Sequence, residues 1–174
     1  MAYSGSPTPK NFRGEKSSKK LLATVVWDIH GVFCIDFLPR GSTVDSDMYI
    51  KTLKKLKARI QRVRPGLPMQ RVLFHHDNAP PHTSAKTRET IDSMGWTTLP
   101  HPPYSPDLAP SDYHLFGPMK LHMKGIRHEN DNDLKAAVTA WLRHQPQEFY
   151  RKGIRDLTQR RATAIMRKGE YIED

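Results

Sequence analysis

The chain has 174 residues, of which 28 are Lys or Arg and 18 are Asp or Glu, and its formal net charge is +10 at pH 7. This length is enough for one domain with a substantial core, and the positive charge favours a polyanionic partner such as nucleic acid. No stretch approaches the roughly 18 consecutive apolar residues of a membrane span. The single cysteine, Cys34, excludes an intrachain disulfide.

The first part of the chain predicts a basic arm followed by a β-hairpin. Residues 1–20 carry Gly, Ser, Pro and Lys without hydrophobic periodicity, which is typical of a flexible arm. Residues 21–27 and 32–38 are apolar runs with β propensity, and the Asp-Ile-His-Gly segment between them has turn chemistry. We therefore expect a domain over residues 21–174 that starts with two antiparallel strands.

A long amphipathic helix is predicted next. Asp45 or Ser46 can cap its start, and Pro65-Gly66 ends it. Its apolar side chains recur at helical spacing, at Ile50, Leu53, Leu56, Ile60 and Val63. Lys and Arg occupy most of its other faces, so the helix combines a core-facing side with a basic side.

The remaining chain alternates strands and helices. The pattern predicts a buried strand that ends at His76, a helix over 84–94 closed by Gly95, and a short strand over 96–99. It then predicts a helix over 111–124 kinked at Gly117-Pro118, a helix over 134–144, and a last helix from 146 or 147 to 167 that is broken at Gly153. This order of elements indicates a mixed α/β layer fold.

Two acids stand where predicted elements meet loops. Asp77 follows the apolar run of residues 72–74 and precedes an Asn-Ala-Pro-Pro turn, and Asp112 follows a proline-rich loop and opens a helical pattern. The 34 residues between them leave room for one helix, one strand and a loop, which can return the second acid to the same sheet edge. Carboxylates of this kind can hold Mg²⁺ together with phosphate oxygens. The competing interpretation is that each acid is an ordinary turn or helix-capping residue.

The sequence around both acids resembles the catalytic domain of mariner-type transposases, in the Tc1/mariner group of cut-and-paste enzymes. The likeness is carried by His-Asp-Asn-Ala-Pro-Pro-His at residues 76–82 and by Tyr-Ser-Pro-Asp-Leu-Ala-Pro-Ser-Asp-Tyr at residues 104–113, with the family's spacing between the acids. It extends from Trp27-Asp28 to the C-terminal end, although Val26 and Arg161 stand where the family has Trp. The resemblance implies a ribonuclease-H-like α/β fold, with a mixed sheet flanked by helices. It also implies metal-dependent DNA cleavage and strand transfer, DNA as the partner, a homodimer, a nuclear location and no membrane association.

By this resemblance, Asp77 and Asp112 are the second and third acids of a catalytic triad that binds Mg²⁺ or Mn²⁺. The family's first acid lies in a strand ahead of the Trp-Asp pair, and the sequence begins after that position. The resemblance therefore predicts that the chain lacks the family's first, central strand and is inactive alone. It also predicts that residues 1–20 are the remnant of the loop before the second strand. Asp28 could be considered as a substitute acid, but its place beside the hairpin predicts a turn residue.

The residues predicted to contact DNA fall into two groups. One is the basic run of the long helix, which favours salt-sensitive contact with phosphates, and the other adjoins Asp77, where His76 is predicted to orient the carboxylate or contact a phosphate. The whole set is Lys54, Lys55, Arg59, Arg62, His76 and Asn78. The histidines have neither accompanying Cys pairs nor the spacing of a zinc module, which argues against zinc. The alternative function is a non-catalytic nucleic-acid-binding or interaction module derived from a transposase.

Overall fold

The computed structural model describes residues 20–169, so residues 1–19 of the predicted arm lie outside the described residues. The strands are β1 (Ala23–Asp28), β2 (Gly31–Phe37), β3 (Leu73–Phe74) and β4 (Thr97–Thr98). The helices are α1 (Ser46–Val63), α2 (Pro80–Thr83), α3 (Ala85–Met94), α4 (Phe116–Met123), α5 (Asp131–His144) and α6 (Gln147–Met166). Short 3₁₀ turns lie at Met69–Arg71 and Pro106–Leu108, and a π-helical segment lies at Ser111–Leu115. The predicted α/β class is confirmed.

The predicted hairpin of β1 and β2 is present and antiparallel, from the pair Ala23–Phe37 to the pair Asp28–Gly31. Its turn is shaped by Asp28, whose Oδ1 accepts a hydrogen bond from the backbone N–H of His30 at 2.8 Å. The other oxygen of Asp28 forms an ion pair with Arg64 at the end of α1. These contacts confirm Asp28 as a turn residue.

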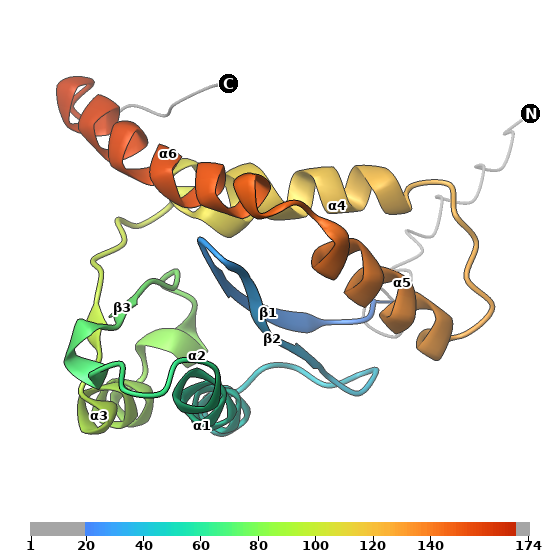
Figure 1. Cartoon of the computed structure of the whole chain (residues 1–174), viewed down its shortest axis with the longest axis horizontal. Coiled ribbons are helices and arrows are strands. Elements are labelled where there is room, and N and C mark those ends of the chain that lie inside the picture. The colour runs from blue at the N-terminus through green and yellow to red at the C-terminus, as the bar shows by residue number, and fades with distance from the viewer. Residues whose placement is uncertain (1–19, 170–174) are drawn as a thin grey trace, which may run out of the picture.

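The hairpin separates two hydrophobic cores, since it lies between α1 on one side and α4, α5 and α6 on the other (Figure 1). The first core gathers Tyr49, Leu53, Leu56 and Ile60 of α1 with Phe74, Ile91, Met94 and Trp96. The second gathers Leu115, Val138, Leu142 and Tyr150. Alternate hairpin residues face opposite cores, as the pleat of a strand requires. A bulge opposite Val26 and Trp27 inserts Phe33, so that Phe33 and Cys34 both pack on the first core.

A second small sheet consists of β3 and β4, which are parallel and pair Leu73 with Thr97 and Phe74 with Thr98. Within residues 20–169, no strand joins this sheet to the hairpin. That arrangement agrees with the expectation that the family's central strand is not among these residues. Each predicted strand is present, but β3 and β4 are only two residues long. The prediction of a buried strand ending at His76 is wrong in detail, because β3 ends at Phe74 and Leu73 is 68% exposed.

Most predicted helix boundaries are confirmed by their caps. The Asp45 side chain accepts a hydrogen bond from the Met48 N–H at 2.8 Å, and Ser84 and Asn130 cap α3 and α5 in the same way. Gly95 ends α3 at φ 78°, a left-handed conformation that favours glycine. None of the helices among the described residues is long and apolar enough to cross a membrane.

Three details of the predicted helices are wrong. The core-facing side of α1 uses Tyr49, which is 4% exposed, whereas Val63 is 47% exposed because the first core ends before the last helical turn. The irregularity near Gly117-Pro118 is the preceding π-helical segment, and Pro118 is accommodated in the first turn of α4. Helix α6 is not broken at Gly153 but runs through it, because that position is packed against His114 and Trp27.

Candidate active site

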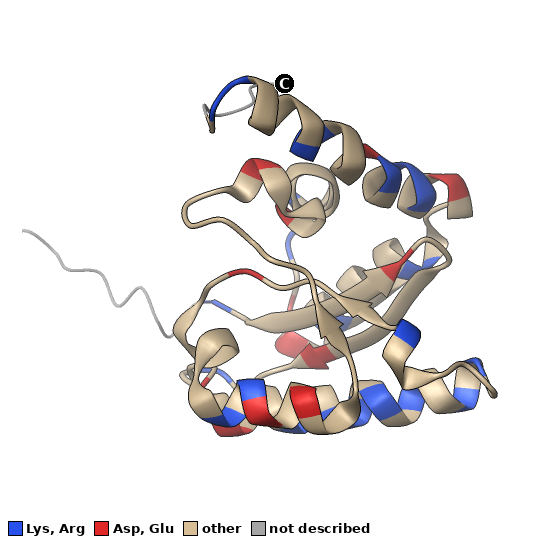
Figure 2. Ribbon diagram, turned by 90° about the vertical axis from the view of Figure 1, so that its left-hand side faces the viewer, with Lys and Arg blue, Asp and Glu red and all other residues tan. Residues whose placement is uncertain are grey.

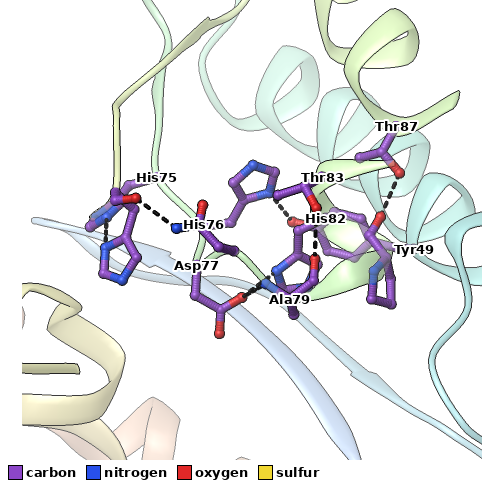
Figure 3. A network of polar contacts seen from close by, with 11 residues as sticks. Tyr49, His75, His76, Asp77, Ala79, His82, Thr83 and Thr87 are labelled. Carbon is purple, nitrogen blue, oxygen red and sulfur yellow. Dashed lines mark hydrogen bonds and ion pairs between the residues drawn. The ribbon is translucent and has the colours of Figure 1, made fainter. Parts of the chain in front are cut away.

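Asp77 lies in the loop between β3 and α2, with its side chain 50% exposed. Its Oδ1 accepts hydrogen bonds from the Ala79 N–H at 3.0 Å and from His82 Nδ1 at 2.6 Å (Figure 3). The bond from His82, more than any other influence, lowers the pKa of Asp77 to about 2. The carboxylate is therefore ionised at neutral pH and can attract a cation.

The His82 ring is itself held between two other rings. Tyr49 of α1 lies with its ring centroid 4.1 Å from that of His82, and His76 is stacked on His82 at 5.1 Å with the planes 6° apart. Tyr49 Oη lies 2.8 Å from His76 Nδ1. Burial raises the pKa of Tyr49 well above its usual range, so the phenol stays protonated in its contact with His76. The interpretation of His76 as the residue that orients Asp77 is wrong, because His82 makes that contact.

Asp112 lies in the π-helical segment, and its immediate neighbours are anchored to β1 and α6. Trp27 Nε1 donates to Ser111 Oγ at 2.9 Å, and Tyr113 Oη donates to the Gly153 carbonyl. His114 Nε2 lies 2.6 Å from the Phe149 carbonyl, which can only accept. Partial burial and the negative charge of Asp77 raise the pKa of Asp112. The two carboxylates thus interact electrostatically across the site.

The proline-rich loop before Asp112 is tied to the end of β3. His75 Nε2 lies 3.1 Å from His101 Nδ1, and Asn78 Nδ2 donates to the His101 carbonyl at 2.8 Å. Burial lowers the pKa of His101, while the charges of Asp77 and Asp112 oppose that shift. His101 therefore lies within the field of both acids.

Helix α6 closes the other side of the same loop. Arg161 donates to the Pro100 carbonyl, and the Arg160 guanidinium lies 4.1 Å from the centroid of the Tyr113 ring. These two arginines hold the loop that leads to Asp112.

Among the described residues, no group of three or more His, Cys, Asp or Glu side chains is placed to hold a metal ion. The histidine cluster therefore gives no support to a zinc site. Asp77 and Asp112 are two oxygen donors of the type that Mg²⁺ and Mn²⁺ prefer, and these ions take their remaining ligands from water or phosphate. The pair fits such an ion as a partial set of ligands.

A cavity of about 300 Å³ lies beside Asp77, between the end of β3 and helices α2 and α3. Its lining combines imidazole, amide and guanidinium groups with apolar side chains. The residues include His76, Asn78, His82, Arg88, Ile91 and His101. Such a mixed lining suits a polar ligand that also carries flat, apolar surface.

The predicted DNA-binding residues are divided between two places. Lys54 and Arg62 are exposed on α1 and Arg59 is half-buried there, while Lys55 is exposed but pairs with Asp36 of β2 at 3.1 Å. In Figure 2 the Lys and Arg positions are blue. His76 and Asn78 lie instead beside Asp77. The next basic residue of the α1 run, Arg64, is turned inward, where it pairs with Asp28 and lies 4.9 Å from the Phe33 ring centroid.

Sequence reasoning missed His82 and Tyr49. His82 lies five residues after Asp77, but only the Pro80-Pro81 turn, which forms α2, brings its ring back to the carboxylate. Tyr49 is distant in sequence, and the helical pattern assigned Ile50 in its place to the core. The spacing of Tyr49 with Leu53, Leu56 and Ile60 was the available signal.

The family described as "Transposase (partial DDE domain)" matches residues 3–69. The chain is 38% identical over 171 residues to the Mariner Mos1 transposase of Drosophila mauritiana, covering 97% of this chain and 50% of that protein. It therefore spans about half the length of that relative. A solved structure of the Mos1 transposase catalytic domain with raltegravir and Mn has a TM-score of 0.84 at 38% identity, covering 88% of this chain and 78% of that one. The Mos1 transposase paired-end complex with the left transposon end has a TM-score of 0.85 at 37% identity, covering 99% and 51%.

Proposed function

Because the chain belongs to the mariner-type DNA transposase family and corresponds to its catalytic domain, we propose that it carries part of a metal-dependent site for DNA cleavage and strand transfer. Asp77 and Asp112 are the proposed ligands for Mg²⁺ or Mn²⁺. The observation that carries the proposal is the fixed carboxylate of Asp77, whose Oδ1 accepts hydrogen bonds from the Ala79 N–H and from His82 Nδ1 within a sequence box shared with the family. The Mos1 catalytic domain has been solved with Mn, which supports a divalent ion at the corresponding place.

In this proposal, a bound divalent ion would activate an attacking oxygen and stabilise the leaving oxygen of a phosphodiester. Asp77 would bind such an ion through a carboxylate that two hydrogen bonds hold in place. Asp112 would supply a second carboxylate from a segment anchored to β1 and α6. The cavity beside Asp77 would receive part of the DNA strand.

We further propose that a polypeptide of residues 1–174 does not cleave DNA by itself. The family reaction uses three acids, whereas among the described residues no group of three His, Cys, Asp or Glu side chains is placed to hold a metal ion. Within residues 20–169, β1 pairs only with β2 and β3 only with β4, so each has an edge available to another strand. Nicking of supercoiled DNA by this polypeptide in Mg²⁺ would contradict the proposal.

Calorimetric titration with Mn²⁺ tests the two proposed ligands. Asp77→Asn and Asp112→Asn are each expected to weaken binding by more than about tenfold, because each removes the negative charge of a ligand oxygen. Asp47→Asn is the matched control, since this acid on α1 is 71% exposed and pairs with Lys86 of α3 at 3.6 Å. Equal Mn²⁺ affinity in all variants would exclude these acids as the metal site and favour a non-catalytic binding module.

DNA binding through the exposed side of α1 makes a separate prediction. Replacing Lys54 and Arg62 together by Gln is expected to reduce the slope of log K against log salt by roughly 2, because about one counterion per phosphate contact is no longer released. Fluorescence anisotropy with a labelled duplex measures this slope. The control replaces Lys152 and Arg155, which already pair with Asp156 and Glu148 on α6. An unchanged slope in the α1 variant would exclude that helix as the contact.

We also propose a homodimer and a nuclear location for this chain, because the family implies both.

A further inference from the structure

We propose that His82 is a positioning residue for Asp77, which fixes one carboxylate oxygen so that the other stays directed toward a divalent cation. The inference rests on the proposed function of Asp77 as a metal ligand. It adds a residue that does not touch the ion itself. The two hydrogen bonds that Asp77 accepts are marked in Figure 3.

Both hydrogen bonds to the carboxylate reach the same oxygen. The Ala79 N–H and His82 Nδ1 lie 3.0 and 2.6 Å from Oδ1, and together they fix the rotation of the carboxylate. An ionised carboxylate only accepts, so the hydrogen of the shorter bond belongs to His82 Nδ1. Oδ2 is thereby left for a ligand that approaches from the exposed side of Asp77, whose side chain is 50% exposed.

The imidazole is fixed by more than its bond to Asp77. Tyr49 and His76 both pack on the His82 ring, and the Tyr49 hydroxyl joins them through His76 Nδ1 at 2.8 Å. Tyr49 is 4% exposed and belongs to the first core, while His76 makes an edge contact with Phe74 at 4.9 Å. The position of His82 is therefore set by the packing of α1 and β3. Supporting groups of this kind typically change metal affinity by about 10- to 100-fold when they are removed.

Two substitutions at His82 separate positioning from simple packing. In His82→Asn, the side-chain amide nitrogen is at the same number of bonds from Cα as Nδ1, so the variant keeps a donor for Asp77. His82→Leu keeps a similar shape but has no donor. If His82 only filled space, His82→Leu would preserve Mn²⁺ affinity better than His82→Asn does.

The first measurement is Mn²⁺ affinity of the full chain by calorimetry, with thermal unfolding of each variant in parallel. We expect His82→Leu to bind Mn²⁺ about tenfold more weakly and His82→Asn to stay within about threefold of the unmodified chain. Equal affinity in the two variants, whether both weak or both unchanged, would overturn the inference. Asp77→Asn distinguishes a failure of this inference from a failure of the proposed function. If Asp77→Asn binds Mn²⁺ as tightly as the unmodified chain does, Asp77 is not a metal ligand and the proposed function is wrong.

The second measurement needs no metal. Long-range ¹H–¹⁵N NMR reports which ring nitrogen of an imidazole carries hydrogen. We expect the Nδ1–H tautomer at His82 in the unmodified chain and its loss in Asp77→Ala, where the acceptor is gone. An Nε2–H tautomer in the unmodified chain would overturn the inference even if the chain bound no Mn²⁺.

Discussion

Lowering the pH from 7 to 4 is expected to reduce the free energy of unfolding by on the order of 2 kcal/mol for each of two histidines, His75 and His76. Burial is the largest cause that lowers the pKa of each to about 4. In the unfolded chain both would titrate near their ordinary pKa of about 6.5. Between these values the unfolded state binds more protons than the folded state. The stabilisation is therefore complete above about pH 6.5 and is lost as the pH falls toward 4.

The two acids of the site act differently on the stability in this pH window. The pKa of Asp77 is lowered to about 2, so its stabilising contribution is lost only below pH 4. The pKa of Asp112 is raised, so its protonation favours the folded state as the pH falls and opposes the effect of the histidines. Urea unfolding at a series of pH values between 4 and 7, without added metal, measures the net dependence.

A single substitution identifies the source of the pH dependence. His76→Asn removes one of the two titrating groups and is expected to reduce the loss of stability between pH 7 and 4 by about half. The substitution also removes the acceptor of the Tyr49 hydroxyl, so stability at pH 7 falls as well; the comparison is therefore made on the slope. A slope identical to that of the unmodified chain would show that His76 does not contribute.

The parts of the fold that were predicted correctly are those that depend on local chemistry. The hairpin follows from two β-rich runs around the turn at residues 28–31, and the starts of α1 and α3 follow from side-chain caps at Asp45 and Ser84. The ribonuclease-H-like fold came from the two sequence boxes rather than from periodicity, and the likeness to the Mos1 catalytic domain confirms it. Strand lengths were not predictable in this way. They depend on the neighbours available in the sheet, and β3 has a single short partner in the described part of the chain.

The residues of the candidate site also fall into those that local sequence predicts and those that depend on distant segments. The two acids could be picked out from their places after an apolar run and before a helical pattern, and their role as metal ligands stays a prediction. The groups that hold these two acids could not be predicted from the sequence, because each acts through packing of segments far apart in the chain. Tyr49 reaches His76 and His82 from α1, and Trp27 reaches Ser111 from β1. Hydrophobic periodicity identifies which side of a helix faces the core, but it does not show which ring or hydroxyl group a side chain on that side will contact.

Gly153→Ala is expected to destabilise the chain by about 2 to 3 kcal/mol, although alanine is the better helix former. A Cβ at position 153 would lie 2.9 Å from Cγ of His114 and 2.9 Å from Cη2 of Trp27, and closer still to Cδ2 of His114. Neither ring is free to move away, since His114 bonds to the Phe149 carbonyl and Trp27 bonds to Ser111. The gain in helix propensity, about 1 kcal/mol, is smaller than the cost of displacing two packed rings. Urea unfolding measures the difference.

Gly117→Ala is the matched control, because a Cβ at that helical position of α4 meets nothing within 4 Å. It is expected to leave stability unchanged or raise it by up to about 1 kcal/mol. A methyl group at position 153 would also affect the site, because it would displace two rings that adjoin the Asp112 segment. His114 follows Asp112 by two residues, and Trp27 donates a hydrogen bond to Ser111. We therefore expect Gly153→Ala to weaken Mn²⁺ binding as well, whereas Gly117→Ala does not. If Gly153→Ala were as stable as Gly117→Ala, the close packing of α6 on β1 and the Asp112 segment would be disproved.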